Sequence, residues 1–106
     1  MRAMVFESYG EPEIMRLRDA PVPEPQDSEV LIRVGYAGVN PSDSKARAGY
    51  NFTLPFVTGV DAAGVVERTG TNVTEFRQGD RVITWCERDG RTWGSYAARV
   101  PGSSAM

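Results

Sequence analysis

Short apolar stretches that alternate with charged or polar residues dominate this chain, and turn-forming residues separate them. Residues 14–18 alternate apolar and charged side chains, which is the two-residue period of a half-buried strand. Residues 29–39 place Val30, Ile32 and Val34 on one face in the same way. Further strands are predicted at 3–6, 60–69, 81–86 and 95–100, with polar turns at 9–12, 69–72 and 87–90. The chain is therefore predicted to be mainly β.

One short helix is predicted near residues 41–48. Pro41 suits the first position of a helix, Ser42 and Asp43 supply polar groups for its first turn, and Gly49 can end it. Many short strands with a single short helix favour a partly open, antiparallel β-barrel. Within the long predicted strand, Gly35 and Gly38 indicate a bulge or a close approach of another segment, and prolines at 21, 23 and 25 predict an extended surface connector.

Composition changes this fold prediction little, but it argues against some classes of partner. The chain has 106 residues, a formal net charge of −2 and 41% hydrophobic residues, which fits one soluble domain. Its basic residues are scattered, so neither a nucleic acid nor an acidic membrane is the predicted partner. No apolar run is long enough to span a bilayer. With one cysteine and no signal-peptide core, we expect a cytoplasmic protein.

Several motifs in a fixed order carry a family resemblance. They are Arg2–Phe6, Gly10–Glu13, Glu29–Val34, Gly38–Pro41, Arg47–Tyr50 and Gly79–Val82. Together they resemble the N-terminal, GroES-like catalytic domain of the medium-chain dehydrogenase/reductases, and within these the zinc-free quinone oxidoreductases of the zeta-crystallin type. The resemblance covers essentially all of residues 1–106 and implies one GroES-like (alcohol dehydrogenase N-terminal) domain. Members of this family transfer a hydride from NADPH to quinones or enones, in a cleft between this domain and a Rossmann domain.

The same resemblance predicts that no metal is used. Zinc-dependent alcohol dehydrogenases of the superfamily carry a cysteine at the position of Asn40, and Gly-His-Glu where this chain has Gly59, Val60 and Asp61. Catalytic zinc takes about three Cys, His or carboxylate ligands. Asn40 and Val60 are not such ligands, and the chain contains no histidine. Because alcohol oxidation relies on zinc as a Lewis acid, whereas an enone needs only hydrogen bonds to its carbonyl, the missing ligands favour quinone or enone reduction.

The resemblance also assigns cofactor contacts. It implies that Asn40 lies near the nicotinamide and offers its amide to the cofactor or to a substrate carbonyl, although an asparagine before a proline equally well caps the helix. Lys45 stands where zeta-crystallins have a cofactor-contacting tyrosine, so its ammonium is a candidate for a phosphate or ribose contact; the alternative is a solvated surface lysine. For Asp43, a structural charge in the first helical turn is favoured over a catalytic group.

The loop after the helix is the predicted substrate entrance. There, Tyr50, Asn51 and Phe52 correspond to the family's substrate-binding positions, although the two aromatic residues can instead cover the end of the barrel. Ser42 and Tyr50 are weak candidates for a proton donor, and water can supply the proton, so no catalytic residue is assigned.

Other conspicuous residues are interpreted as structural. Cys86 is predicted to be a buried apolar residue, since no histidine can activate it. Trp85 and Trp93 are interpreted as core or interface anchors. Gly59 and Gly64 are expected at a corner of the barrel.

Residues 1–106 contain no glycine-rich Gly-x-Gly-x-x-Gly loop between a strand and a helix, so the Rossmann domain is expected to be absent from this chain. Two functions remain open. The chain is the catalytic half of an NADPH-dependent reductase of quinones or enones, inactive and a poor NADPH binder alone, or it is a non-enzymatic GroES-like binding or assembly module. The face that a second domain would cover is expected to be apolar and to favour a homodimer.

Overall fold

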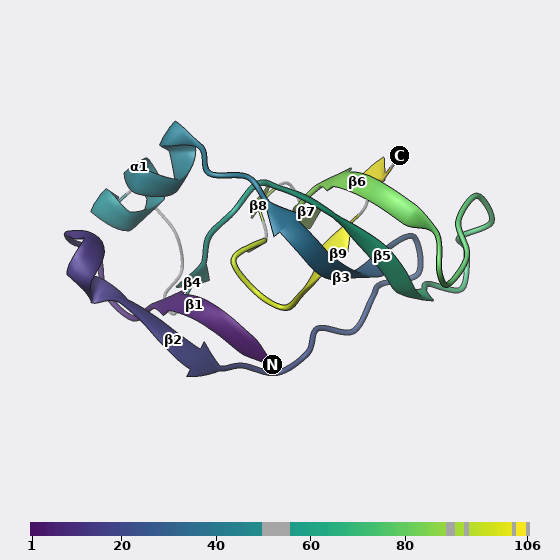
Figure 1. The fold of residues 1–106 in the computed structure, drawn as a ribbon, viewed down its shortest axis with the longest axis horizontal. Helices are drawn as coiled ribbons and strands as arrows, with labels where there is room; N and C mark the ends of the chain where they lie inside the picture. Colours follow the sequence, from purple (N-terminus) through teal and green to yellow (C-terminus); the bar gives the residue numbers. More distant parts are fainter. Residues whose placement is uncertain (50–55, 89–90, 93, 103, 106) are drawn as a thin grey trace.

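The computed structural model describes residues 1–49, 56–88, 91–92, 94–102 and 104–105, and strands dominate them (Figure 1). A 3-10 helix, η1 (Pro12–Ile14), and one α-helix, α1 (Pro41–Gly49), accompany the strands. The strands are β1 (Arg2–Phe6), β2 (Met15–Asp19), β3 (Val30–Ala37), β4 (Phe56–Val57), β5 (Asp61–Thr69), β6 (Arg81–Trp85), β7 (Glu87–Arg88), β8 (Arg91–Thr92), β9 (Arg99–Gly102) and β10 (Ser104–Ala105). The mainly β prediction with a short helix near residues 41–48 is confirmed.

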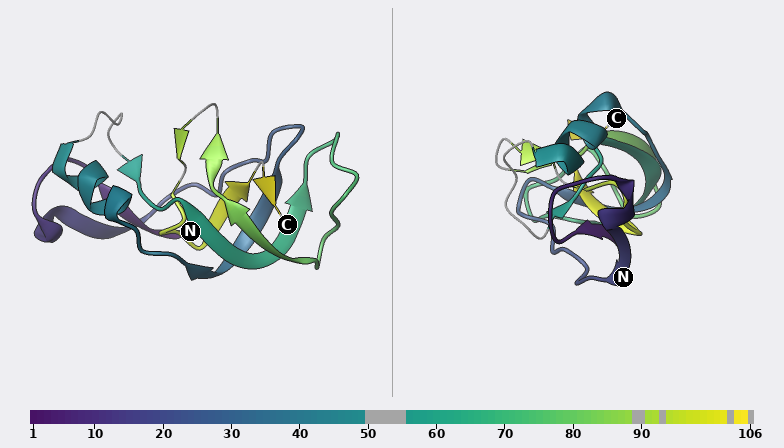
Figure 2. Two further views of the ribbon diagram at one scale, coloured as in Figure 1. Left: turned by 90° about the horizontal axis from the view of Figure 1, so that it is seen from above. Right: turned by 90° about the vertical axis from the view of Figure 1, so that its left-hand side faces the viewer.

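The strands form three antiparallel sheets. A five-stranded sheet has the order β10-β6-β5-β3-β9, a three-stranded sheet has the order β2-β1-β4, and β7 pairs with β8. β2 folds back on β1 in antiparallel register. The molecule measures 41 × 24 × 20 Å, with the larger sheet towards one end and α1 with the smaller sheet towards the other (Figures 1 and 2).

One short segment joins the two larger sheets. The backbone N–H of Met4 in β1 donates to the carbonyl of Tyr96, and the N–H of Ala98 donates to the carbonyl of Arg2. On its other side, the Ala98 carbonyl accepts from the N–H of Val34 in β3 at 3.0 Å. Residues 96–98 therefore connect β1 with β3 through a few hydrogen bonds instead of a continuous ladder. This explains why the barrel is only partly closed in the described residues.

A hydrophobic core cluster lies on the five-stranded sheet, and further buried residues lie on β1. In β3, Val30 and Ile32 are buried as predicted, and Val34 packs against them. The rest of this core cluster consists of Ala62, Val66, Val82, Cys86 and Val100. Burial of each Val or Ile side chain contributes about 1.5–3 kcal/mol, so these residues are the main source of the sheet's stability.

A bulge changes the direction of β3 near its end. Val34 pairs with Gly64 and Tyr36 pairs with Ala63, so Gly35 is an extra residue in β3. The bulge that was predicted here is confirmed. Beyond it, β3 is exposed, and the Tyr36 residue has 82% of its surface accessible. The last residues of β3 therefore leave the core and lead to the helix.

Some sequence expectations are wrong. The strand expected at 95–100 begins only at Arg99, because the preceding residues cross between the two sheets and make an isolated bridge at Ala97. The predicted polar loop at 87–90 contains β7, which pairs with β8. The strand expected to start at Ile14 starts at Met15, and Ile14 ends η1.

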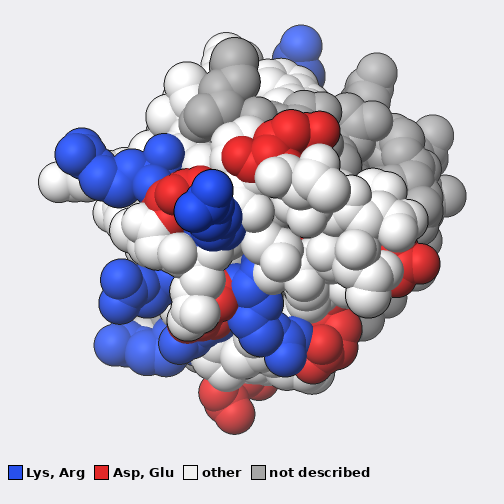
Figure 3. Space-filling view, turned by 90° about the vertical axis from the view of Figure 1, so that its right-hand side faces the viewer, with Lys and Arg blue, Asp and Glu red and all other residues white. Residues whose placement is uncertain are grey.

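The surface mixes charges of both signs. Arginine and acidic side chains lie interspersed on the face shown in Figure 3. Paired examples include Arg99 with Glu67 at 2.9 Å and Arg18 with Glu7 at 3.1 Å. The proline connector is largely exposed, as predicted. Among the described helices, none is long and apolar enough to cross a membrane.

Candidate functional site

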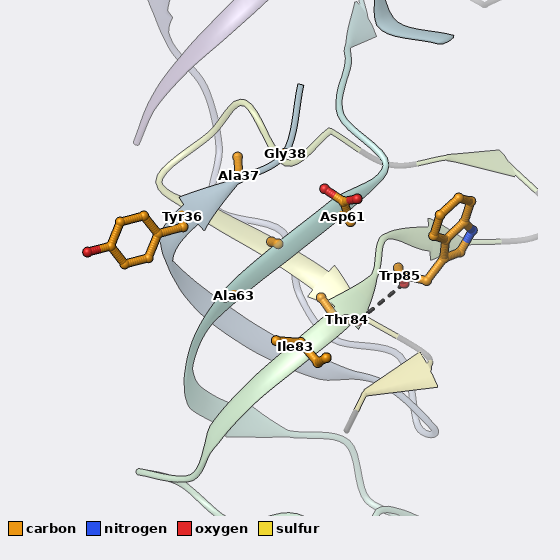
Figure 4. Close-up of a pocket in the computed structure, with 9 residues that line it drawn as sticks. Tyr36, Ala37, Gly38, Asp61, Ala63, Ile83, Thr84 and Trp85 are labelled. Atoms are coloured by element: carbon orange, nitrogen blue, oxygen red, sulfur yellow. Dashed lines mark hydrogen bonds between the residues drawn. The ribbon is translucent and has the colours of Figure 1, made fainter. Parts of the chain in front are cut away.

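A wide groove lies on the outer face of the five-stranded sheet, where β3 ends and β5 begins (Figure 4). Its volume is about 580 Å³. The residues that line it are Tyr36, Ala37, Gly38, Asp61, Ala62, Ala63, Ile83, Thr84 and Trp85. The lining is mainly apolar, and Asp61 is its single charged member. Such a surface suits a flat apolar ligand that brings one polar group.

The Asp61 carboxylate is packed directly against Gly38. A Cβ atom at residue 38 would lie 2.0 Å from Asp61 Oδ1, so no other residue fits there without displacing the acid. The Gly38 N–H also donates to the backbone carbonyl of Asp61 at 3.3 Å. The close approach predicted at Gly38 is therefore confirmed, and its consequence is a carboxylate held at the end of β3.

Asn40 lies two residues farther along the chain, between two carboxylates. Its backbone N–H donates to Asp43 Oδ2 at 2.8 Å, which caps the start of α1 from the helix's third residue. Its side-chain Nδ2 donates to Asp61 Oδ2 at 3.5 Å. The hydrogen bond of the Asn40 side chain thus runs to the groove acid, while Asp43 supplies the cap at this position.

Asp43 is a buried hub of hydrogen bonds. Besides the Asn40 N–H, it accepts from Thr58 Oγ1 at 3.0 Å and from the Tyr96 hydroxyl at 2.9 Å. Burial, followed by the hydrogen bond to Asp43, raises the pKa of Tyr96 to about 12. These contacts tie α1 to the start of β5 and to the segment that joins the sheets, in agreement with a structural role for Asp43.

The other predicted site residues are not brought together in the groove. Ser42 and Lys45 are exposed on α1, and neither lines the groove. The end of α1 is held by a different contact, in which the Arg47 guanidinium donates to the Gly10 carbonyl at 3.1 Å. The predicted substrate residues Tyr50, Asn51 and Phe52 lie outside the described residues.

Sequence reasoning missed four residues that shape the groove: Tyr36, Asp61, Ile83 and Trp85. Trp85 is 49% exposed, so of its two interpretations the core anchor is wrong and the interface anchor stays a prediction; Trp93 lies outside the described residues. Figure 4 shows Tyr36 and Trp85 on opposite sides of Asp61. A usable signal was an acid directly after Val60 and directly before the apolar residues 62–66.

Cys86 is buried in the core, as predicted. Burial, with a smaller effect of the nearby Asp61, raises the pKa of its thiol to about 12. The thiol is therefore protonated near neutral pH and is a poor nucleophile. In the part of the chain that the structure describes, no group of three or more His, Cys, Asp or Glu residues is arranged to hold a metal ion.

The fold is that of a GroES-like domain, with an apolar groove whose acid, Asp61, contacts the Asn40 amide. Comparison with known families agrees. The family described as "Alcohol dehydrogenase GroES-like domain" matches residues 26–104. The chain belongs to this family, and the resemblance to quinone oxidoreductases that the sequence motifs carry is confirmed by the relatives below.

A quinone oxidoreductase of Sus scrofa is 44% identical over 88 residues, which are 79% of this chain and 27% of that protein. Among solved structures, the quinone oxidoreductase from Coxiella burnetii has a TM-score of 0.92 and 31% identity, covering 100% of this chain and 36% of its own. A mycobacterial protein complexed with NADPH has a TM-score of 0.87 and 34% identity over 97% of this chain and 31% of its own. The chain thus spans about a quarter to a third of the length of the relatives it matches.

Proposed function

We propose that this domain is the catalytic half of a zinc-independent, NADPH-dependent oxidoreductase that reduces quinones or enones. The observation that carries the proposal is half-buried Asn40, whose backbone N–H is bound by Asp43 and whose side-chain amide contacts Asp61, the acid of an apolar groove. The similarity to quinone oxidoreductases and to a protein complexed with NADPH supports it. Reaction in a reducing cytoplasm, with a second copy as partner, is part of the same hypothesis.

The residues of the site fit a planar, largely apolar ligand with one polar end. The groove offers apolar surface for such a ring, and the Asn40 amide offers a hydrogen bond at the ring's edge. NADPH, when bound, supplies the hydride that the acceptor receives. Lys45 is exposed on α1, and its ammonium is a candidate for a phosphate contact. The role of this chain is then to orient the nicotinamide and to exclude water from the reacting face.

Zinc independence rests on the donor atoms available in the sequence. The two positions that hold zinc ligands in relatives of the superfamily are Asn40 and Val60 here, and the chain has no histidine. The remaining acid pair is already engaged, because Asp43 accepts three hydrogen bonds and Asp61 accepts one from Asn40. These residues suit hydrogen bonding to a carbonyl compound or a cofactor better than ligation of a zinc ion.

The test is NADPH oxidation by the complete polypeptide that carries this domain, with a quinone and an enone in turn as acceptor, beside NADP⁺ reduction with a primary alcohol as donor. We expect turnover with the quinone and the enone, unchanged by a chelator, and no NADP⁺ reduction with the alcohol. The substitution Asn40→Ala should lower kcat/KM, whereas Glu75→Gln, at an exposed acid that does not line the groove, should leave it unchanged. Alcohol oxidation that a chelator abolishes would overturn the proposal. Ligand binding without any NADPH oxidation would favour the binding-module hypothesis.

A further inference from the structure

We infer that Asp61 is a positioning residue that turns the side-chain amide of Asn40, so that Asn40 meets its ligand through Oδ1 as a hydrogen-bond acceptor. This inference rests on the proposed function, in which Asn40 contacts the cofactor. It adds the direction of that contact, and therefore the kind of chemical group that Asn40 can recognise.

The first step is the placement of the Asp61 carboxylate. It lies against Gly38, where a Cβ would be 2.0 Å from Oδ1, 2.8 Å from Cγ and 3.1 Å from Oδ2. The backbone hydrogen bond from Gly38 to the Asp61 carbonyl holds the two strands together at this point. The carboxylate is thus directed toward the end of β3, within reach of the Asn40 side chain.

The second step is that the Asn40 backbone has little freedom. Its N–H is bound by Asp43, and Asp43 is itself held by Thr58 and Tyr96. The remaining freedom is rotation of the side-chain amide. An ionised carboxylate only accepts hydrogen bonds, so it favours Nδ2 on its side and disfavours Oδ1, which would bring acceptor against acceptor. The recorded contact from Nδ2 to Asp61 Oδ2, at 3.5 Å, has this orientation.

The third step is chemical. The oxygens of a quinone and of an enone are acceptors, and they cannot pair with Oδ1. A nicotinamide carries a carboxamide NH₂ group, which is a donor. With Nδ2 turned to Asp61, Oδ1 is the atom of the amide that a donor can reach, and we assign it to the carboxamide NH₂ of NADPH. A substrate carbonyl would have to use the second N–H of Nδ2, and the KM for the acceptor in the Asn40 and Asp61 variants tests that alternative.

The orientation of the Asn40 side-chain amide can be tested by NMR without measuring enzymatic activity. In protein labelled with ¹⁵N-asparagine, the side-chain NH₂ signals of Asn40 should shift as Asp61 is titrated with acid, in the pH range where the spectrum stays dispersed. The exposed Asn72 is an internal reference, and the Asn40 backbone N–H reports on Asp43 separately. Asp61→Ala and Asp61→Asn should both abolish the side-chain shift. A wild-type shift that survives in Asp61→Ala would overturn the inference.

A kinetic test on the complete polypeptide separates the two proposals. Asn40→Ala and Asp61→Ala should each raise the KM for NADPH about tenfold, as expected for the loss of one hydrogen bond, and leave the KM for the acceptor unchanged. Asp61→Asn should restore the wild-type KM for NADPH, because its Oδ1 can still accept from Asn40. If Asp61→Ala raises the KM for the acceptor instead, the inference is wrong while the function stands. If the wild type oxidises no NADPH, the proposed function fails, and the spectroscopic result alone decides the orientation.

Discussion

Asp43 shows how one buried side chain can organise several distant segments. It accepts hydrogen bonds from a backbone N–H and from two hydroxyls, and these donors come from the helix start, from Thr58 and from Tyr96. A buried carboxylate is costly unless such donors satisfy it. Its role is therefore to hold these segments in place around a hydrogen-bonded carboxylate, and catalysis need not involve it.

Replacing Asp43 by alanine should lower the free energy of unfolding by about 2–4 kcal/mol, because one buried and two partly buried donors lose their acceptor. Asp43→Asn should cost less, since its Oδ1 can still accept, although its NH₂ group must face one of the former donors. Urea unfolding, followed by tryptophan fluorescence, measures both. Equal stability of Asp43→Ala and the wild type would show that the hub contributes nothing.

Two side chains with raised pKa values predict how the free energy of unfolding depends on pH. Cys86 has a pKa of about 12 in the folded chain against an ordinary value of 9.0, and Tyr96 has about 12 against 10.0. The unfolded chain therefore loses these protons first. Their contribution to the free energy of unfolding is fully present below about pH 9 and is lost as the pH rises towards about 12.

Urea unfolding at about pH 8 and about pH 10.5 should thus give a lower free energy of unfolding at the higher pH. Cys86→Ala should be less stable at the lower pH, because it leaves a small cavity, but should lose less between the two. A wild type that is equally stable at both values would contradict the assignment.

Backbone conformation matters most at the corner that leads into β5. Gly59 has φ +115°, and a Cβ there would lie 2.1 Å from Ser95 Oγ and 2.6 Å from the Ser95 backbone nitrogen. Gly79 also has a positive φ, of +95°, but a Cβ there would meet nothing within 4 Å. A side chain at residue 79 would therefore cause backbone strain alone, whereas one at residue 59 would cause backbone strain and a steric clash. The predicted role of Gly59 in the geometry of a corner is confirmed.

Gly59→Ala should therefore lower the free energy of unfolding more than Gly79→Ala, which should cost only the strain of about 1–3 kcal/mol. Thermal unfolding of the two variants beside the wild type measures the difference. Equal losses would mean that the Ser95 segment moves away freely, and that it does not fix the corner.

The molecule as a whole presents an exposed apolar face around the groove. Tyr36, Val39, Ile83 and Trp85 are 82%, 84%, 56% and 49% exposed. Contiguous apolar surface of this kind commonly marks contact with another polypeptide surface. The relatives are three to four times longer than the stretch they share with this chain, which agrees with such a contact.

We expect the chain of residues 1–106 to self-associate as its concentration rises, through this face. Ile83→Lys should shift the equilibrium toward the monomer, because it places a charge in the apolar contact, whereas Leu17→Lys, an exposed apolar residue on β2, should not. Sedimentation velocity over a range of concentrations measures this. A wild type that stays monomeric throughout would exclude the dimer.

Much of the architecture follows from local patterns in the sequence. The strands predicted in residues 14–18 and 29–34, the proline that starts α1 and the bulge at Gly35 are all found in the structure. The half-buried pattern predicted for residues 14–18 is wrong, because Leu17 is exposed like its charged neighbours. They depend on side-chain period and backbone preference within a few residues, which a linear reading can detect. The segment 95–98 could not be assigned in this way, because whether it continues a strand depends on two sheets brought together from distant parts of the chain.

The candidate site divides along the same line. The sequence alone made Asn40 a candidate site residue, through the family resemblance. It also showed that the chain has no histidine, and it predicted the burial of Cys86 from the residue type. Folding decided that Asn40 lies between Asp43 and Asp61, and that Asp61 shares a groove with Tyr36 and Trp85. These contacts join residues about twenty or more positions apart, and only the antiparallel pairing of β3, β5 and β6 sets the register that makes them neighbours.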